Sequence, residues 1–321
     1  MKYLSLALIS FCFSNSALAQ NVVFATWNLA WQRSTPLDQQ QFNECKDIKP
    51  SQREKLDETH PYRWECKSPA QISAMAAVAE KLNADIIAVQ EVESAAALQQ
   101  IWPKDEYDFY VNMDSPWIQR TGFVVRKSIG PGIGQFTDVP QIGSAFKDHV
   151  RHGAELTLTV NGKEIKILSV HLKSGCFEKA LNSGYATGRD AANGVITCDV
   201  LKNQAPALEA WLDGAIRSGF SAMIIGDFNR RFDSEVEHKA DPEQSLYAQL
   251  SDGEPPAARL FRPTAGFEAL PECRAGGSKW LIDHALMTSE LKQHYAASSL
   301  LELPVPLKGS DHCPISFRMT F

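Results

Sequence analysis

The sequence predicts an α/β protein in which two β-sheets pack face to face and helices cover their outer surfaces. Two observations support this prediction. Apolar strands alternate with helical segments along the chain, an order that is typical of strands buried beneath helices. Both halves of the chain are also rich in strands, and in each half the strands end in polar side chains. We therefore expect two sheets that direct their polar ends toward one side of a single domain.

The first nineteen residues have the pattern of a secretory signal peptide, residues 1–19. Lys2 precedes an apolar run from Leu4 to Phe13, and Ala17-Leu18-Ala19 forms a small-x-small cleavage site. This apolar run is too short to span a bilayer. We expect an exported protein, periplasmic or secreted, with no stable membrane anchor. Residues 20–321 would form one domain, with a monomer as the default state.

Composition favours a sizeable core and argues against a purely electrostatic nucleic-acid-binding module. Hydrophobic residues make up 44% of the 321 residues, and the formal net charge at pH 7 is −6. A negative chain offers no broad basic surface to nucleic acid. A metal-dependent enzyme is less affected by this charge, because divalent ions in its cleft can face the phosphates.

The cysteines predict disulfides. An even number of cysteines follows the signal segment, and in an exported chain such cysteines usually pair. Cys45 with Cys66 and Cys176 with Cys198 would each close a loop without periodic structure, so we favour these pairs. Cys273 with Cys313 then follows by elimination.

The first half of the chain contains a strand, a helix and a second strand. In order they span residues 22–27, 69–82 and 85–90. Apolar residues at helical spacing, with Pro69 in the first turn, predict the helix. A polar segment from Trp31 to Ser68, without predicted secondary structure, precedes it. This segment is either a wall of a cleft or a solvated insertion, and a disulfide across it would favour a functional loop.

The second half begins with a strand at 121–126 and continues with a hairpin. The hairpin strands span 154–160 and 164–170, and the Asn161-Gly162 pair between them suits a type I′ turn. An irregular insertion at 174–198 follows. A helix over Val200–Ile216 then leads into the buried strand Met223–Ile225, and a further strand is expected to end at Asp283.

Polar side chains follow the apolar segments in both halves. They are Asn28, Glu91, His171, Asp227, Asn229, Asp283, Asp311 and His312. An Asx turn alone would explain Asp227 and Asn229, but the repetition indicates a site, because ligands of open α/β sheets bind beyond the strand ends. Oxygen ligands without thiolates select Mg²⁺ or Mn²⁺, with Ca²⁺ as a third option. With histidines for acid/base chemistry, this set predicts metal-assisted phosphoester hydrolysis.

The motifs around these residues resemble the endonuclease/exonuclease/phosphatase (DNase I-like) superfamily. They are Thr26-Trp27-Asn28, Val89-Gln90-Glu91-Val92-Glu93, Ser169-Val170-His171-Leu172-Lys173-Ser174, Gly226-Asp227-Phe228-Asn229, Ile282-Asp283-His284 and Gly309-Ser310-Asp311-His312-Cys313-Pro314. They occur in the family's order across nearly the whole mature chain. The resemblance implies a four-layered α/β sandwich, two mixed sheets flanked by helices, which agrees with the strand order above.

The resemblance also implies roles for these residues. Asn28 and Glu91 match the positions that hold the main divalent cation, and Asp311 would complete its surroundings. His312 matches the catalytic histidine. Asp283 matches the carboxylate that orients this histidine, an arrangement that fixes the imidazole tautomer.

Four further residues are assigned in the same way. Asp227 and Asn229 match the pair that positions the attacking water or holds a second cation. His171 matches a histidine on the scissile phosphate. Arg151 lies where family members often place an arginine on the substrate phosphate, although a surface arginine is an equal alternative. His284 would point to the opposite face of its strand from Asp283 and be packed or solvated.

The leading functional prediction is an exported Mg²⁺- or Mn²⁺-dependent nuclease that hydrolyses DNA or RNA by water attack on a phosphodiester. One alternative keeps this mechanism with a different substrate, as a phosphatase or a sphingomyelinase or phospholipase C-type phosphodiesterase. A second alternative is an inactive binding protein that retains the fold. We expect substrate choice to depend on the two insertions, residues 31–68 and 174–198.

Overall fold

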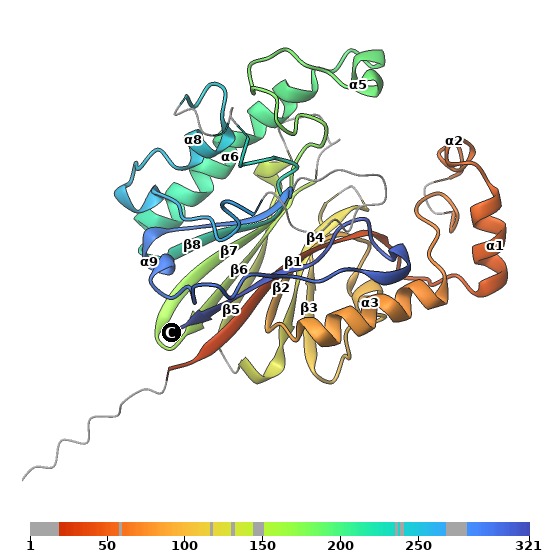
Figure 1. Ribbon diagram of the computed structural model, residues 1–321, viewed down its shortest axis with the longest axis horizontal. Coiled ribbons are helices and arrows are strands. Elements are labelled where there is room, and N and C mark those ends of the chain that lie inside the picture. The colour runs from red at the N-terminus through yellow and green to blue at the C-terminus, as the bar shows by residue number, and fades with distance from the viewer. Residues whose placement is uncertain are drawn as a thin grey trace, which may run out of the picture.

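A computed structural model describes residues 19–57, 60–115, 118–129, 132–143, 151–234, 237, 241–267 and 281–321. Its strands form two sheets that pack face to face, and helices lie against their outer faces (Figure 1). This arrangement confirms the four-layered α/β sandwich expected from the sequence. Within these ranges, no helix has the length and apolar character needed to cross a bilayer.

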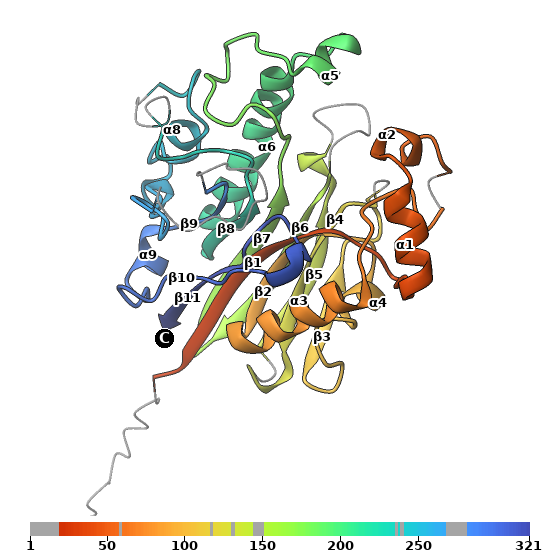
Figure 2. The same ribbon diagram turned by 45° about the vertical axis from the view of Figure 1, so that its right-hand side comes forward.

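The first sheet contains six strands of the described chain, in the order β10-β11-β1-β2-β4-β3. Their bounds are β1 Asn21–Gln32, β2 Ile86–Val92, β3 Tyr107–Val111, β4 Arg120–Arg126, β10 Leu301–Glu302 and β11 Ile315–Thr320. Strands β1 and β2 are parallel, and the other neighbours are antiparallel. Helices α3 (Pro69–Leu82) and α4 (Ala95–Leu98) belong to the layer outside this sheet (Figure 2).

The second sheet contains five described strands in the order β5-β6-β7-β8-β9. Their bounds are β5 Ile133–Val139, β6 Gly153–Val160, β7 Lys163–His171, β8 Ser221–Asp227 and β9 Asp283–Met287. Here β7 and β8 are parallel, and the other neighbours are antiparallel. Helices α6 (Thr197–Arg217) and α8 (Leu246–Leu250) pack outside this sheet.

Shorter elements complete the described chain. They are α1 Gln39–Asp47, α2 Pro50–Arg53, α5 Gly188–Ala192, α9 Ser289–Lys292 and the 3₁₀ turns η1 Lys127–Ile129, η2 Pro140–Ile142, η3 Pro256–Ala258 and η4 Pro306–Lys308. Most of them lie in connections at the ends of the sheets (Figures 1 and 2).

Apolar clusters fill the spaces between the layers. Between the sheets, Phe24 of β1 and Phe317 of β11 stack with ring centroids 5.9 Å apart. Met75 of α3 packs on the first sheet, and Leu208 and Leu212 of α6 pack on the second. Burying a side chain of this size contributes about 1.5–3 kcal/mol. The clusters therefore hold the strand ends of both sheets in a fixed relation.

The central strands of both sheets bring polar residues to one edge. In the register of β7 and β8, His171 lies opposite Asp227. Asp283 is the first residue of β9 and also pairs with Asp227, the last residue of β8. The prediction of a strand that ends at Asp283 is therefore wrong, because β9 starts there. Since β9 runs antiparallel to β8, its first residue still reaches the same edge.

Two strong local signals are confirmed. The predicted helix has the bounds of α3, where the side chain of Ser68 accepts from the Gln71 backbone N–H and Asn83 ends the helix with a φ of 44°. The predicted hairpin is β6 and β7, and its turn residues Asn161 and Gly162 have φ values of 48° and 79°.

The segment from Trp31 to Ser68 differs from its prediction because it contains α1 and α2. Cys45 is the buried residue of α1, so the helix shows no apolar periodicity that a sequence pattern could reveal. Its first turn is instead defined by a capping box between Asp38 and Gln41.

Gly226 allows β8 to approach β7 closely. Its φ is 144°, and a Cβ there would lie 2.2 Å from the carbonyl oxygen of Val170. We expect Gly226→Ala to lower the free energy of unfolding by about 3 kcal/mol, because the clash is with backbone and the conformation disfavours a side chain. Urea unfolding of the oxidised protein measures this change.

The matched control is Gly214→Ala in the middle of α6, where an added Cβ meets no heavy atom within 4 Å. This change should raise stability by about 0.5–1 kcal/mol. An unchanged urea midpoint for Gly226→Ala would contradict the close approach of the two strands.

Candidate active site at the strand ends

Three polar side chains from three central strands meet at the shared edge of the sheets. The Asn28 side-chain amide donates to Glu91 Oε1 at 3.2 Å and to Asp227 Oδ2 at 3.0 Å. Asn28 and Asp227 are buried, and the Glu91 side chain is 14% exposed. The residues come from both sheets, so the site exists only when the sheets are packed together.

Unusual backbone conformations turn two of the site residues toward this edge. Glu91 has a φ of 57° and Asn229 a φ of 51°. A non-glycine residue in this region costs about 1–3 kcal/mol, and such residues concentrate at functional sites. The pairing of β1 with β2 is also irregular between Asn28 and Gln32. Strands β1 and β2 thus continue past Asn28 and Glu91, where the sequence predicted their ends. The irregular backbone at these residues directs their side chains toward the site.

The Asp227 carboxylate is fixed from two sides. Its Oδ1 accepts the Asn229 backbone N–H at 2.8 Å, and the Asn229 side-chain amide donates to the Leu172 carbonyl at 3.1 Å. Its Oδ2 faces Asn28 and the two histidines of the site. The Asx turn considered from sequence therefore exists, and it orients the carboxylate of the site.

His312 and Asp283 form a buried pair. The distance between His312 Nδ1 and Asp283 Oδ2 is 2.7 Å. The other ring nitrogen, Nε2, lies 3.8 Å from Asp227 Oδ2 and 3.9 Å from Asp311 Oδ1. A carboxylate at Nδ1 holds the proton on that nitrogen. Nε2 is then the nitrogen directed at the other site residues.

Two hydrogen bonds fasten the His312 loop to β1. The Trp27 indole donates to the His312 carbonyl at 3.1 Å, and the Ser310 hydroxyl donates to the Asn28 carbonyl at 2.7 Å. The histidine near the end of the chain is thereby held against the strand that carries Asn28.

His171 is a neutral imidazole at neutral pH. Burial lowers its pKa well below the ordinary value, and the positive charges of Arg151 and His312 act in the same direction. Its Nε2 lies 3.5 Å from Glu91 Oε1 and 3.6 Å from Asp227 Oδ2. Nδ1 is buried without a hydrogen-bond partner among the described residues. The ring can therefore offer a further hydrogen bond.

Arg151 is 8% exposed and is not a surface arginine. It donates to the Leu172 carbonyl at 2.8 Å, while its Nε has no hydrogen-bond partner within the described part of the chain. Burial lowers its pKa, and the carboxylates of Glu91 and Asp227 oppose this shift. The Arg151 guanidinium therefore interacts electrostatically with the Glu91 and Asp227 carboxylates of the site.

Asp311 occupies the rim of the site. Its side chain is 65% exposed and contacts the rest through the 3.9 Å approach to His312.

The residues fit a hard divalent cation. Asp227, Asp283 and His312 are buried and offer ligand atoms that lie within 4.8 Å of one another, and Asn28 and Glu91 adjoin Asp227. Asp283 Oδ1 is buried and accepts no hydrogen bond from a described residue. Buried carboxylates that crowd together are costly without a compensating positive charge. Carboxylate and amide oxygens are also the ligands that Mg²⁺ and Mn²⁺ prefer.

A model of the Endonuclease/Exonuclease/phosphatase family matches residues 25–312 of the sequence. The chain belongs to this family. A search of curated proteins found no match.

Solved structures of the family share the fold. Truncated TDP2 from Caenorhabditis elegans matches with a TM-score of 0.55 at 16% identity, over 94% of this chain and 98% of that truncated one. D. rerio TDP2 complexed with a single-strand DNA product matches with a TM-score of 0.53 at 13% identity, over 93% and 98%. A family protein from Bacteroides thetaiotaomicron matches with a TM-score of 0.54 at 13% identity, over 95% and 99%.

In this family member, both insertions flank the site and carry disulfides. The predicted Cys45–Cys66 and Cys176–Cys198 bonds are present. Cys313 is also disulfide-bonded, and its predicted partner Cys273 lies outside the described residues. The insertions contact each other through Glu54 and Arg189, whose charged groups are 3.4 Å apart.

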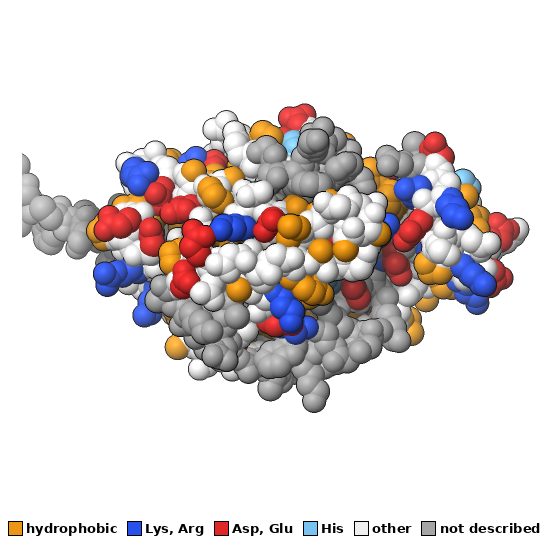
Figure 3. All heavy atoms as spheres, turned by 90° about the horizontal axis from the view of Figure 1, so that it is seen from above, with side chains coloured by type: hydrophobic (Ala, Val, Ile, Leu, Met, Phe, Trp, Pro, Cys, Tyr) orange, Lys and Arg blue, Asp and Glu red, His pale blue; other side chains and the backbone are white. Residues whose placement is uncertain are grey.

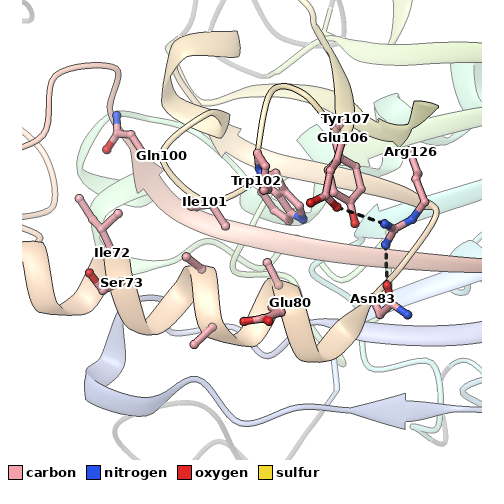
Figure 4. A pocket seen from close by; sticks show the side chains of 14 residues that line it. Ile72, Ser73, Glu80, Asn83, Gln100, Ile101, Trp102, Glu106, Tyr107 and Arg126 are labelled. Carbon is pink, nitrogen blue, oxygen red and sulfur yellow. Dashed lines mark hydrogen bonds and ion pairs between the residues drawn. The ribbon is translucent and has the colours of Figure 1, made fainter. Parts of the chain in front are cut away.

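A hollow along α3 is a poor candidate for the catalytic site (Figure 4). Arg126 lines it, donating to Asn83 Oδ1 at 2.7 Å and to Asp85 Oδ1 at 3.1 Å. The same guanidinium lies over the Tyr107 ring. Because Arg126 is already paired, this hollow offers a ligand little unmet charge.

No sequence pattern indicated a role for Lys67. Its ammonium is buried and donates to the Leu29 carbonyl and to Gln32 Oε1. The available signal was its position directly after Cys66, at the end of a loop that a disulfide closes.

His284 is packed as a neutral imidazole behind the site. One ring nitrogen lies 2.8 Å from the Thr264 hydroxyl and the other 2.9 Å from the Arg230 carbonyl. Burial lowers its pKa to about 3, and the positive charge of Arg262 acts in the same direction. The expectation of a packed residue on the opposite face is consistent with these contacts.

We expect His284 to destabilise the fold in acid. Its pKa is about 6.5 in the unfolded chain and about 3 in the folded protein, so between these values the unfolded chain binds more protons. Its stabilising contribution is complete above about pH 6.5 and falls by about 1.4 kcal/mol per pH unit as the pH decreases toward 3. Urea unfolding at several pH values measures this loss. In His284→Gln the slope should shrink, and an identical slope in both proteins would exclude His284 as its source.

Proposed function

We propose that this protein is an exported, divalent-metal-dependent phosphodiesterase of a single domain, residues 20–321, and that its substrate is a nucleic acid. The observation that carries the proposal is the buried His312–Asp283 pair, whose Nε2 faces Asp227 beside Asn28 and Glu91. This combination supplies a proton-transfer group and a cation site within one cluster. The two disulfides support export, because such bonds persist in oxidising compartments.

Asn28 and Glu91 would hold the main cation, with Asp311 at its rim, and Asp227 with Asn229 would adjoin it or hold a second one. Mg²⁺ or Mn²⁺ suits these oxygen ligands, and Ca²⁺ remains a third option. A bound cation would neutralise phosphate charge and so favour attack on phosphorus.

The protein's own groups would then divide the remaining work. Asp283 keeps a proton on Nδ1 of His312, so Nε2 is the atom that accepts or donates a proton during hydrolysis. Asp227 and Asn229 orient the attacking water through their oxygens. The neutral His171 imidazole and the Arg151 guanidinium donate hydrogen bonds to phosphate oxygens, which concentrates their effect where negative charge develops.

Asp227→Asn and His312→Ala should each lower the rate of diester hydrolysis by about 10²–10⁴-fold, since each removes a group that touches the reacting atoms. The assay follows cleavage of a single-stranded oligonucleotide and hydrolysis of bis(p-nitrophenyl) phosphate by residues 20–321, with Mg²⁺ or Mn²⁺ and with a chelator. Asp105→Asn makes the same chemical change at an exposed position and should retain full activity. Metal-independent hydrolysis, or full activity of either site variant, would contradict the proposal.

A stack of two tryptophans favours a substrate that contains bases. The rings of Trp31 and Trp64 are 4.1 Å apart and nearly parallel, at 9°, and the Arg63 guanidinium lies 4.9 Å from the Trp64 ring. Trp31 is three residues beyond Asn28, and both tryptophans are partly exposed. A base that stacks on an aromatic side chain gains about 1–3 kcal/mol.

The surface charge favours a single strand over a long duplex. Acidic and basic side chains are interspersed on the face shown in Figure 3, and the net charge is −6. Duplex binding without a basic surface is weak at physiological salt. D. rerio TDP2, whose fold is similar, was solved with a single-strand DNA product, which supports a single-stranded substrate for this chain.

Trp64→Ala should raise KM for a single-stranded oligonucleotide by about 5–100-fold, the equivalent of one lost stacking interaction. Hydrolysis of bis(p-nitrophenyl) phosphate should be unchanged, and Trp64→Phe should restore most of the affinity. A KM that does not move would remove the support for a base-containing substrate. The alternatives are tested with sphingomyelin and with phosphomonoesters. If the oligonucleotide stays intact, release of phosphocholine would identify a sphingomyelinase, and release of phosphate from monoesters would identify a phosphatase.

A further inference from the structure

The first insertion, residues 31–68, contacts the backbone that follows Asn28. Lys67, next to Cys66, is 6% exposed. Its ammonium donates to the Leu29 carbonyl and, at 3.1 Å, to Gln32 Oε1. Both acceptors belong to the last residues of β1, so a residue of the insertion is bonded to the strand that carries a proposed cation ligand.

This part of β1 has an unusual conformation that needs external support. Ala30 and Trp31 have φ values of 47° and 59°, and the ladder to β2 is irregular between Asn28 and Gln32. Such residues cost about 1–3 kcal/mol each and persist when surrounding contacts hold them. The Ala30 backbone N–H donates to Asn28 Oδ1 at 2.9 Å. The turn therefore determines where the Asn28 side chain is held.

Nearby carboxylates offset only part of the cost of burying the Lys67 ammonium. A buried ammonium is costly unless it is paired and hydrogen-bonded. Burial lowers the pKa of Lys67 to about 7, and the carboxylates of Glu65, Glu91 and Asp311 oppose this effect. The charges of Glu91 and Asp311 act on the ammonium, and its hydrogen bond to the Leu29 carbonyl places Lys67 against the residue that follows Asn28.

The Cys45–Cys66 disulfide holds Lys67 in this place. Helix α1 has one buried residue, Cys45, and offers little apolar packing. The bond joins this helix to Cys66, and the Arg53 side chain donates to Cys66 Sγ and to the Trp64 carbonyl. A covalent link restrains a segment that its few apolar contacts could not order.

We infer that Lys67 is a positioning residue for the cation site. Its two hydrogen bonds hold the turn that orients the Asn28 carboxamide, and the disulfide-closed insertion holds Lys67. The insertion is thereby a structural part of the site. This inference rests on the proposed function, because it assumes that Asn28 serves a bound cation.

The test is Mn²⁺ binding by residues 20–321, followed by electron paramagnetic resonance without substrate. Lys67→Met keeps the length of the side chain but cannot donate, and we expect it to raise Kd for Mn²⁺ by about 10–100-fold, as for other residues that orient metal ligands. Lys67→Arg keeps the charge and donors and should restore part of the affinity. Lys49→Met removes the same charge from an exposed position on the same insertion and should bind Mn²⁺ like the wild type.

Thermal unfolding of each variant separates positioning from a purely structural role. A folded Lys67→Met protein whose Mn²⁺ Kd stays within twofold of the wild type would overturn the inference. Should this variant not fold, Lys67→Gln, which keeps one donor for the Leu29 carbonyl, takes its place under the same criterion. Failure of both to fold would show a role in stability alone and would also overturn it.

The wild-type protein distinguishes this failure from failure of the proposed function. If the wild type binds Mn²⁺ and hydrolyses diesters, and Lys67→Met binds Mn²⁺ equally well, the role of Lys67 is refuted. The proposed function is then still supported. Wild-type protein that neither binds Mn²⁺ nor hydrolyses a diester refutes the function itself.

Discussion

The Asp227 carboxylate is the group on which the arrangement of the site depends. One oxygen is held by the Asn229 backbone, and the other faces Asn28, His171 and His312. These partners come from both sheets and from the loop before β11. A buried carboxylate is tolerated when such partners surround it. The packing of one sheet on the other is therefore coupled to the chemistry at their common edge.

The two sheets supply different parts of the site. The first sheet contributes Asn28 and Glu91, which lie beside each other at the ends of parallel strands. The second contributes Asp227 and His171, and it presents Asp283 to the histidine of the His312 loop. The proposed proton-transfer pair is itself shared, because His312 lies on the loop before β11 of the first sheet while Asp283 begins β9 of the second.

Local signals explain how much could be predicted from sequence. Asn161-Gly162 and the periodic helix that starts at Pro69 are determined by nearby residues, and the polar strand ends are visible as motifs. Edge strands such as β3 and β5 are half-exposed and show weak alternation. The polar helix α1 is stabilised by a disulfide and a cap. Lys67 acts through contacts 35 and 38 residues away in the chain, which no local pattern records.

The pairing of β1 with β11 has a consequence for the order of assembly. The strand that carries Asn28 lies against the last strand of the chain, and Ser310 bonds to the Asn28 carbonyl. The two disulfides whose cysteines both lie in the described ranges, in contrast, join residues only 21 and 22 positions apart. The insertions can therefore close while the chain is still emerging, but the proposed catalytic cluster cannot form before Ser310, His312 and β11 are in place. A chain that ended before these residues would lack the cluster on which the proposed activity depends.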